Sequence, residues 1–178
     1  YNTASNESAF SEELSWAYVP PVASTVIVDN VSAMVMGTWT NSAFSPGYWG
    51  AGYLHDGNTG KSSNKWVMFD ARLPASGEWE VSLWYVAAAN RATNVPVQIE
   101  NRNGVLAEYR VNQRINGSRW TPVATCEFTA AESAYVFVGV AGTTNHVIAD
   151  AVRFRLVRQM VWTWPDVPAA LRATGETL

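Results

Sequence analysis

The stretch WEVSLWY, residues 79–85, decides the fold class, because large apolar residues alternate in it with residues of other kinds. Alternation with a period of two is typical of a β-strand that buries one face. We therefore expect one face of this strand to point to the core, with Trp79, Val81, Leu83 and Tyr85 on it. Glu80, Ser82 and Trp84 share the other face, so Trp84 is predicted to point outward.

Short β-branched and aromatic runs of the same kind recur on both sides of this stretch, separated by clusters of Gly, Pro and Asn. They predict strands over residues 25–29, 34–40, 65–71, 79–87, 95–100, 105–112, 119–128, 134–140 and 147–157. We find no convincing helix among them. The pattern predicts an all-β fold, an antiparallel β-sandwich of jelly-roll-like form with about nine strands.

The two ends of the chain differ from this pattern. Residues 1–23 are rich in Ser, Asn and Glu and end in a Pro-Pro pair, which indicates a lead-in segment. Residues 24–158 form the predicted sandwich. Residues 159–178, which include Trp162 and Trp164, indicate a C-terminal extension or linker. Since the first residue is Tyr1 and not Met, we interpret the chain as an excised fragment or a processed product.

Charge and hydropathy exclude several classes of partner. The 178 residues suit one domain with short tails, and 12 basic against 15 acidic side chains give a net charge of −3. Nucleic acids and anionic membranes need a positive face, and the sequence has no cluster of Lys or Arg. No apolar stretch approaches the roughly 18 residues of a membrane span. We therefore expect neither nucleic acid binding nor a membrane-spanning segment.

Composition favours contact with sugars. Charged residues make up 15% of the chain, below the ~25% usual for soluble domains, so the surface must be solvated largely by uncharged polar residues. Nine Trp and seven Tyr exceed what a core of this size requires. Proteins that bind sugars lay the apolar face of a pyranose on an aromatic ring and hydrogen-bond the hydroxyl groups beside it.

The loop over residues 44–53 concentrates polar-tipped aromatic residues among Gly and Pro. We predict that this turn lifts Tyr48, Trp49 or Tyr53 to the surface as the carbohydrate-binding element. The alternative is a loop that caps the core. Trp84 and Trp120 are further candidates for sugar contact, and burial is the alternative for each of them.

Three polar residues are interpreted as structural. Asp150 follows Ile148 on one face of the last predicted strand, among apolar neighbours, so its carboxylate must find donors or move to the rim. Arg91, in the loop over residues 90–94, is the basic partner that we predict for it, because Arg can clamp a carboxylate. Asp29 and Asp150 are expected to anchor strand ends.

Catalytic and metal-binding patterns are weak. His55, His146, Asp150 and the many serines are the residue types of a catalytic triad, but no nucleophile-elbow context accompanies them. Carboxylate pairs for glycoside hydrolysis can be drawn from several Asp and Glu residues, Asp70 included, without a fixed separation. The turn over residues 55–58 suits either Ca²⁺ or, as we favour, a solvated Asp-Gly turn. We predict no catalytic residue, no bound metal and no cofactor.

Several motifs, in their order and spacing, resemble the golvesin C-terminal-like domain, also known as the carbohydrate-binding-like domain of golvesin and xanthan lyase. They are Val28-Asp29-Asn30, Gly37-Thr38-Trp39, Ser45-Pro46-Gly47-Tyr48-Trp49-Gly50, Trp79-Glu80-Val81, Asn90-Arg91-Ala92-Thr93-Asn94, Val111-Asn112-Gln113 and residues 147–154. The resemblance runs from about residue 25 to 157. It implies a β-sandwich module appended to secreted or cell-surface bacterial proteins, among them polysaccharide lyases and flavin-dependent oxidoreductases. We carry over no set of catalytic residues from it.

The sequence thus predicts a non-catalytic accessory module of a secreted or cell-surface bacterial multidomain protein, located outside the cell, on its surface or in the periplasm. Its expected partners are polysaccharide, contacted through exposed aromatic residues, and neighbouring domains of the parent chain. The alternative is a docking module whose aromatic residues, centred on Trp162 and Trp164, pack on a sister domain. A hydrolase or lyase would instead require a cleft around Asp29, Arg91 or Asp150.

Overall fold

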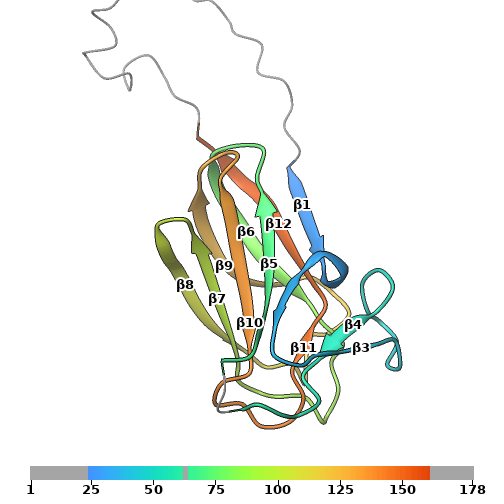
Figure 1. Cartoon of the computed structure of the whole chain (residues 1–178). Coiled ribbons are helices and arrows are strands. Elements are labelled where there is room, and N and C mark those ends of the chain that lie inside the picture. The colour runs from blue at the N-terminus through green and yellow to red at the C-terminus, as the bar shows by residue number, and fades with distance from the viewer. Residues whose placement is uncertain (1–23, 62–63, 161–178) are drawn as a thin grey trace, which may run out of the picture.

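The structure is a computed structural model that describes residues 24–61 and 64–160. Two antiparallel sheets form most of it (Figure 1). The first sheet has the strand order β1 (Thr25–Asp29), β12 (Ala151–Gln159), β6 (Gly77–Trp84) and β9 (Thr121–Phe128). The second has the order β2 (Met34–Met36), β5 (Trp66–Arg72), β10 (Ser133–Gly139), β7 (Val95–Asn101) and β8 (Gly104–Val111).

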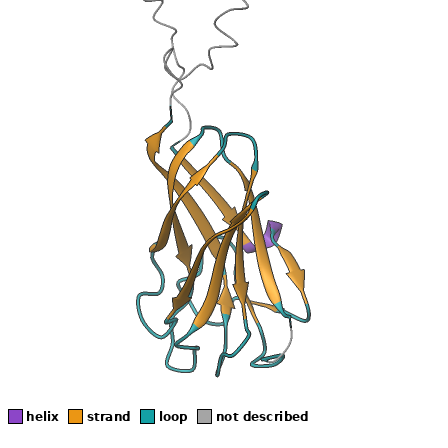
Figure 2. Ribbon diagram, turned by 90° about the vertical axis from the view of Figure 1, so that its left-hand side faces the viewer, coloured by secondary structure: helices purple, strands orange, loops and turns teal. Residues whose placement is uncertain are grey.

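A small third sheet lies at the end of the sandwich away from the start of β1 and the end of β12 (Figure 1). It consists of β11 (Ile148–Ala149), β4 (Tyr53–His55) and β3 (Thr40–Ser42). Almost all regular structure is strand, with one helical turn, η1 (Asn30–Ser32), in the described part (Figure 2). No helix of the described residues is long and apolar enough to cross a membrane.

The core lies between the two large sheets, and the alternation in β6 sets one side of it. The side chains of Trp79, Val81, Leu83 and Tyr85 are all buried, as the sequence predicts. Trp79 is completely buried, and its indole Nε1 donates to Ala75 O at 3.1 Å. From the second sheet, alternate residues of β5, β7 and β10 supply valines and Phe69 to the same core. The all-β sandwich is therefore confirmed.

Several strand boundaries differ from the prediction. The predicted strand over residues 34–40 is interrupted after β2, where Gly37 takes a φ of +81° that other residues rarely adopt. The predicted strand over 147–157 divides at Asp150, so that β11 pairs with β4 while β12 pairs with β1 and β6. Strand β4 was not predicted from the sequence. These breaks create the third sheet and, with it, the end of the sandwich where the candidate site lies.

The complete burial of Trp79 predicts a large stability effect. Trp79→Ala should lower the free energy of unfolding by about 3–5 kcal/mol, because it leaves a cavity in a packed core. Trp66→Ala, a half-buried tryptophan on the outer face of β5, should cost much less. Urea unfolding of the two variants and the parent chain measures both. Equal losses for the two variants would contradict this assignment of the core.

Candidate functional site

A loop over residues 43–52 is fixed against the first sheet by Asp150. The Asp150 carboxyl group is only 1% exposed, and both of its oxygens lie 3.2 Å from the backbone N–H of Trp49. The Trp84 indole Nε1 donates to Gly47 O at 2.8 Å. Gly50 has a φ of +61°, and a Cβ there would collide with the Asp29 carboxylate. Residues 47–50, in the middle of the loop, are thereby held in defined positions.

Three of the predicted sugar-contacting residues form one cluster with this loop. The rings of Trp49, Trp84 and Trp120 lie with centroids 5.0–5.3 Å apart, and all three are half-buried. The guanidinium of Arg153 lies 5.1 Å from the centroid of the Trp120 ring. Trp84 points outward from β6, as predicted. Because these rings pack mainly on one another and on Arg153, the cluster fastens the loop to the sheet.

Tyr48 and Tyr53 also face the interior. Tyr53 is 3% exposed, and its hydroxyl accepts hydrogen bonds from Ser42 Oγ at 3.4 Å and Ser45 N at 3.3 Å. Tyr48 is half-buried, with its ring 6.3 Å from that of Tyr53. The prediction that the turn lifts Tyr53 to the surface is therefore wrong. The ring it lifts is Phe44, which is 93% exposed.

Beside Phe44 opens a pocket of about 360 Å³ at the end of the sandwich. Two backbone hydrogen bonds assemble it, from Ala92 N to His146 O at 2.8 Å and from His146 N to Asn90 O at 3.1 Å. They join two loops that lie far apart in the sequence. The pocket is lined by Ser42, Phe44, Ser45, Tyr53, His55, Ala88, Asn90, Arg91 and His146.

Arg91 is the buried cation of this pocket. It is 6% exposed, and its guanidinium donates to Val86 O at 3.2 Å, Asn90 Oδ1 at 2.8 Å and Ser45 Oγ at 3.4 Å. No carboxylate of the described residues forms an ion pair with it. The predicted pairing of Arg91 with Asp150 is therefore wrong, since Asp150 bonds Trp49 N instead. The guanidinium has more N–H groups than these three acceptors use.

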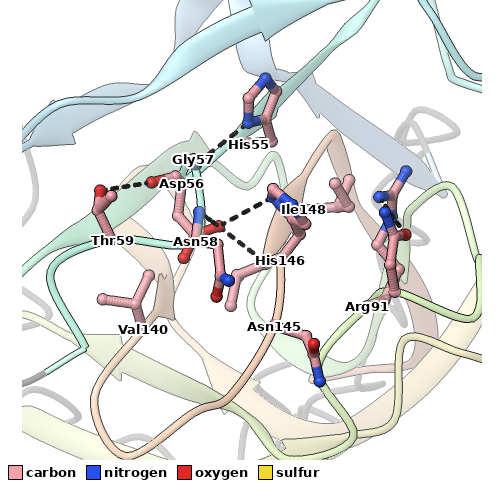
Figure 3. A network of polar contacts seen from close by, with 12 residues as sticks. His55, Asp56, Gly57, Asn58, Thr59, Arg91, Val140, Asn145, His146 and Ile148 are labelled. Carbon is pink, nitrogen blue, oxygen red and sulfur yellow. Dashed lines mark hydrogen bonds and ion pairs between the residues drawn. The ribbon is translucent and has the colours of Figure 1, made fainter.

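A network of polar contacts around Asp56 lies next to the two histidines of the pocket, His55 and His146 (Figure 3). Asp56 is 1% exposed, so its carboxylate is buried. The prediction of a solvated turn over residues 55–58 is therefore wrong for this side chain. Asp56 Oδ1 accepts from Val147 N at 2.9 Å, and Oδ2 accepts from the ammonium group of Lys61. The Lys65 ammonium donates to Asp56 O at 2.6 Å. The side chains of Lys61 and Lys65 therefore supply the positive charge beside the Asp56 oxygens, which the sequence offered as possible Ca²⁺ ligands.

His55 and His146 lie side by side, with ring centroids 5.8 Å apart. Burial and the neighbouring His146 lower the pKa of His55, against the opposing effect of the Asp56 carboxylate. His55 is therefore predominantly neutral at pH 7. Arg91, whose guanidinium stays charged, is the permanent positive group of the pocket.

The chemistry of this lining suits binding. It includes no Asp or Glu, so the carboxylate pair of a glycoside hydrolase is not assembled there. Asp150 does not line the pocket and cannot complete a triad with its histidines. Asp29 accepts from Val31 N at 3.4 Å at the start of η1, and Asp70 lies exposed on β5. What remains is a buried cation, several hydrogen-bonding groups and one exposed ring.

Comparisons with known proteins agree with the fold. The family model described as the golvesin C-terminal domain matches residues 26–156. A xanthan lyase from Bacillus sp. (strain GL1) is 35% identical over 140 residues, which are 75% of this chain and 15% of that protein. The chain thus spans about a seventh of the length of this curated relative.

Solved structures give the same result. The structure of a Paenibacillus xanthan lyase matches with a TM-score of 0.71 and 39% identity, over 76% of this chain and 13% of that one. A family 35 carbohydrate-binding module from Clostridium thermocellum matches with a TM-score of 0.58 and 14% identity, over 76% of this chain and all of that one. The second likeness is one of fold alone.

The environment of Asp150 predicts a pH effect on stability. Burial raises its pKa from 3.8 to about 8, with the Asp29 charge adding to the rise and the Trp49 N–H opposing it. Between about pH 4 and pH 8 the folded chain therefore keeps a proton that the unfolded chain releases. The free energy of unfolding should fall across this window by up to about 1.4 kcal/mol per pH unit on this account.

Asp150→Asn keeps a neutral side chain at this position and should abolish that contribution. Denaturant unfolding of parent and variant at several pH values gives the difference between them, in which other titrating groups cancel. We expect the parent to lose stability relative to the variant as the pH rises from about 4 to about 8. A difference that does not change with pH would contradict the assignment of a neutral Asp150.

Proposed function

The chain belongs to the golvesin C-terminal domain family, and on that premise we propose that it is a non-catalytic accessory module that binds polysaccharide in the pocket beside Phe44. One observation carries the proposal: Arg91, a buried cation without a carboxylate partner in the described part of the chain, lines a pocket whose rim carries an almost fully exposed aromatic ring. Desolvating a charge without a counter-charge is costly, so a ligand that supplies one would be favoured.

The pocket combines the contacts that a sugar needs. A pyranose ring stacks on Phe44, and Ser45, Asn90 and His146 lie nearby for its hydroxyl groups. A carboxylate on that sugar accepts the remaining N–H groups of Arg91. The volume of about 360 Å³ is at the small end of the range for ligand pockets, roughly 300–1,000 Å³, which suits one end or one branch of a glycan. We therefore propose acidic polysaccharides as the ligand class.

Weak binding is sufficient for such a role. A millimolar dissociation constant corresponds to only about 4 kcal/mol. When the module is tethered to a second domain that engages the same polymer, the second encounter becomes intramolecular and the overall affinity rises. The module thus holds a partner domain near its substrate.

The proposed setting is a larger secreted or cell-surface bacterial protein. The similarity to a short part of a xanthan lyase supports a parent with further domains. The fold shared with a carbohydrate-binding module supports carbohydrate as the ligand, and the acidic preference is proposed from Arg91 alone. The partners we propose are polysaccharide and the neighbouring domains of that parent.

A second function, docking on a neighbouring domain, is favoured by one observation. Edge strand β2 is apolar, with Met34, Val35 and Met36 at 60%, 51% and 47% exposure, and Val31 beside it is 73% exposed. Such a strip is typical of an interaction surface. Trp162 and Trp164, on which docking was predicted to centre, lie outside the described residues. If the folded chain binds no glycan of a broad panel, docking becomes the better account.

The proposal predicts selective losses of binding. Phe44→Ala should weaken binding of a uronate-containing oligosaccharide by about tenfold or more, equivalent to about 1.4 kcal/mol, because the stacking ring is lost. Arg91→Lys should weaken the same binding, since Lys lacks the planar fork that grips a carboxylate. Isothermal titration calorimetry on the whole chain measures both.

The matched control is Val105→Ala, another exposed apolar residue, on β8, where binding should not change. Reduction of the ligand's carboxylates to alcohols should weaken binding by the parent chain more than binding by Arg91→Lys, because Lys keeps the charge but has already lost the fork. Saturable binding that Phe44→Ala and Arg91→Lys leave unchanged would place the site elsewhere and contradict the proposal.

A further inference from the structure

The second sheet carries another hollow, on the face turned away from the core. Its volume is about 380 Å³, and no residue lining it also lines the pocket beside Phe44. Strands β5, β7, β8 and β10 contribute most of its residues, so regular structure holds these in place. The hollow could not be predicted from the sequence, because its aromatic and most of its polar members are spread over four strands.

The floor of the hollow is Gly139. Gly139 pairs with Trp66 on β5, and a Cβ built on it would lie 3.3 Å from Pro96 Cγ on β7. In the sheet, the position between Trp66 and Pro96 therefore lacks a side chain. Its neighbours on β10 along the same outward face, Phe137 and Tyr135, fill their positions with rings. A single glycine thus opens the face at one point.

Above Gly139, two aromatic rings meet at nearly a right angle, and we call this pair, Trp66 and Phe137, the aromatic corner. The centroids of Trp66 and Phe137 lie 5.3 Å apart, with the rings at 85° to each other. Both side chains are half-buried. Perpendicular rings fix each other's orientation, and in this arrangement an apolar ring surface lines the hollow.

Polar groups face the rings from β7 and β8. Gln98 pairs with Glu108 across these strands, and Pro96 pairs with Arg110. Gln98 Nε2 donates to Glu100 Oε1 at 2.6 Å. Lys65 also lines the hollow, but its ammonium group donates to Asp56 O and Thr59 Oγ1. Arg110 donates one N–H to Asn94 O at 3.2 Å. The polar groups that line the hollow and can meet a ligand are thus two carboxylates, two amides, one phenol hydroxyl and one guanidinium, from Glu100, Glu108, Asn64, Gln98, Tyr109 and Arg110.

We infer that this hollow is a second glycan site and that it takes uncharged sugar. An aromatic corner beside side chains that both donate and accept hydrogen bonds is the arrangement that recognises a pyranose. Glu100 and Glu108 would repel a sugar carboxylate and can accept from hydroxyl groups instead. The inference rests on the proposed function only for the class of ligand, since the two sites share no residue.

Two sites of different charge give the chain a combined specificity. The pocket with Arg91 selects acidic units, and the hollow over Gly139 selects uncharged ones. A polysaccharide that presents both kinds of unit can engage both sites of one module, which raises its apparent affinity over that of either fragment. Polymers of one kind engage one site only.

The test is a titration of the whole chain with short linear oligosaccharides of glucose and of mannose, followed by two-dimensional NMR. Trp66→Ala removes one ring of the corner, and Gly139→Val fills the floor. We expect each to weaken binding of the uncharged ligands about tenfold or more. Tyr135→Ala, a ring on the same face but outside the hollow, is the matched control and should bind as the parent does.

Phe44→Ala separates this inference from the proposed function. It should leave the uncharged ligands bound while weakening the uronate ligand, and Trp66→Ala should do the reverse. Uncharged ligands that bind equally well to Trp66→Ala and Gly139→Val, both folded, would overturn the second site. So would a parent chain that binds none of them. Neither result would bear on the proposed function, which is tested separately by the loss of uronate binding in Phe44→Ala.

Discussion

The hydrogen bond between the backbone N–H of Trp49 and the buried carboxyl group of Asp150 is the contact on which the pocket end of the molecule depends. Asp150 lies between β11 and β12, and its carbonyl also accepts from Asn30 N at 2.7 Å. One residue therefore joins the first sheet, the small third sheet, the turn after β1 and the loop over residues 43–52. Because burial raises its pKa to about 8, it does so near neutral pH largely without a charge.

This constraint divides the aromatic residues into two groups. Trp49, Trp84 and Trp120 pack on one another and hold the middle of the loop on the sheet. With the middle held, the start of the loop projects Phe44 into solvent beside Arg91. The surplus of aromatic residues in this sequence thus contains both packed rings and an exposed ring, and the exposed ring is the one that we propose to contact a ligand. The exposed ring here is the one with no polar tip.

The alternation in residues 79–85 was sufficient to predict the sandwich. Successive side chains of a strand point to opposite faces, and each face lies in a single environment, either the core or the outside, so a few residues reveal the pattern. The outward direction of Trp84 followed from the same rule. The pocket could not be predicted, since Arg91 and His146 meet through backbone bonds between distant loops. The predicted Arg91–Asp150 pair was wrong for the same reason. The composition shows which residues could pair, but it does not show which of them lie close together in the fold. Gly139 becomes informative only when the register places it between Trp66 and Pro96.

We propose that the loop end of the sandwich, and Arg91 in particular, receives an acidic sugar. The most direct measurement is the ¹H–¹⁵N NMR spectrum of the whole chain, with the Arg91 side-chain Nε–H resolved, during titration with a uronate oligosaccharide. We expect saturable shifts of the Arg91 Nε–H and of amides at Phe44, Ser45, Asn90 and His146. Shifts confined to the region of Trp49, Trp84 and Trp120, or no shift at all, would contradict it.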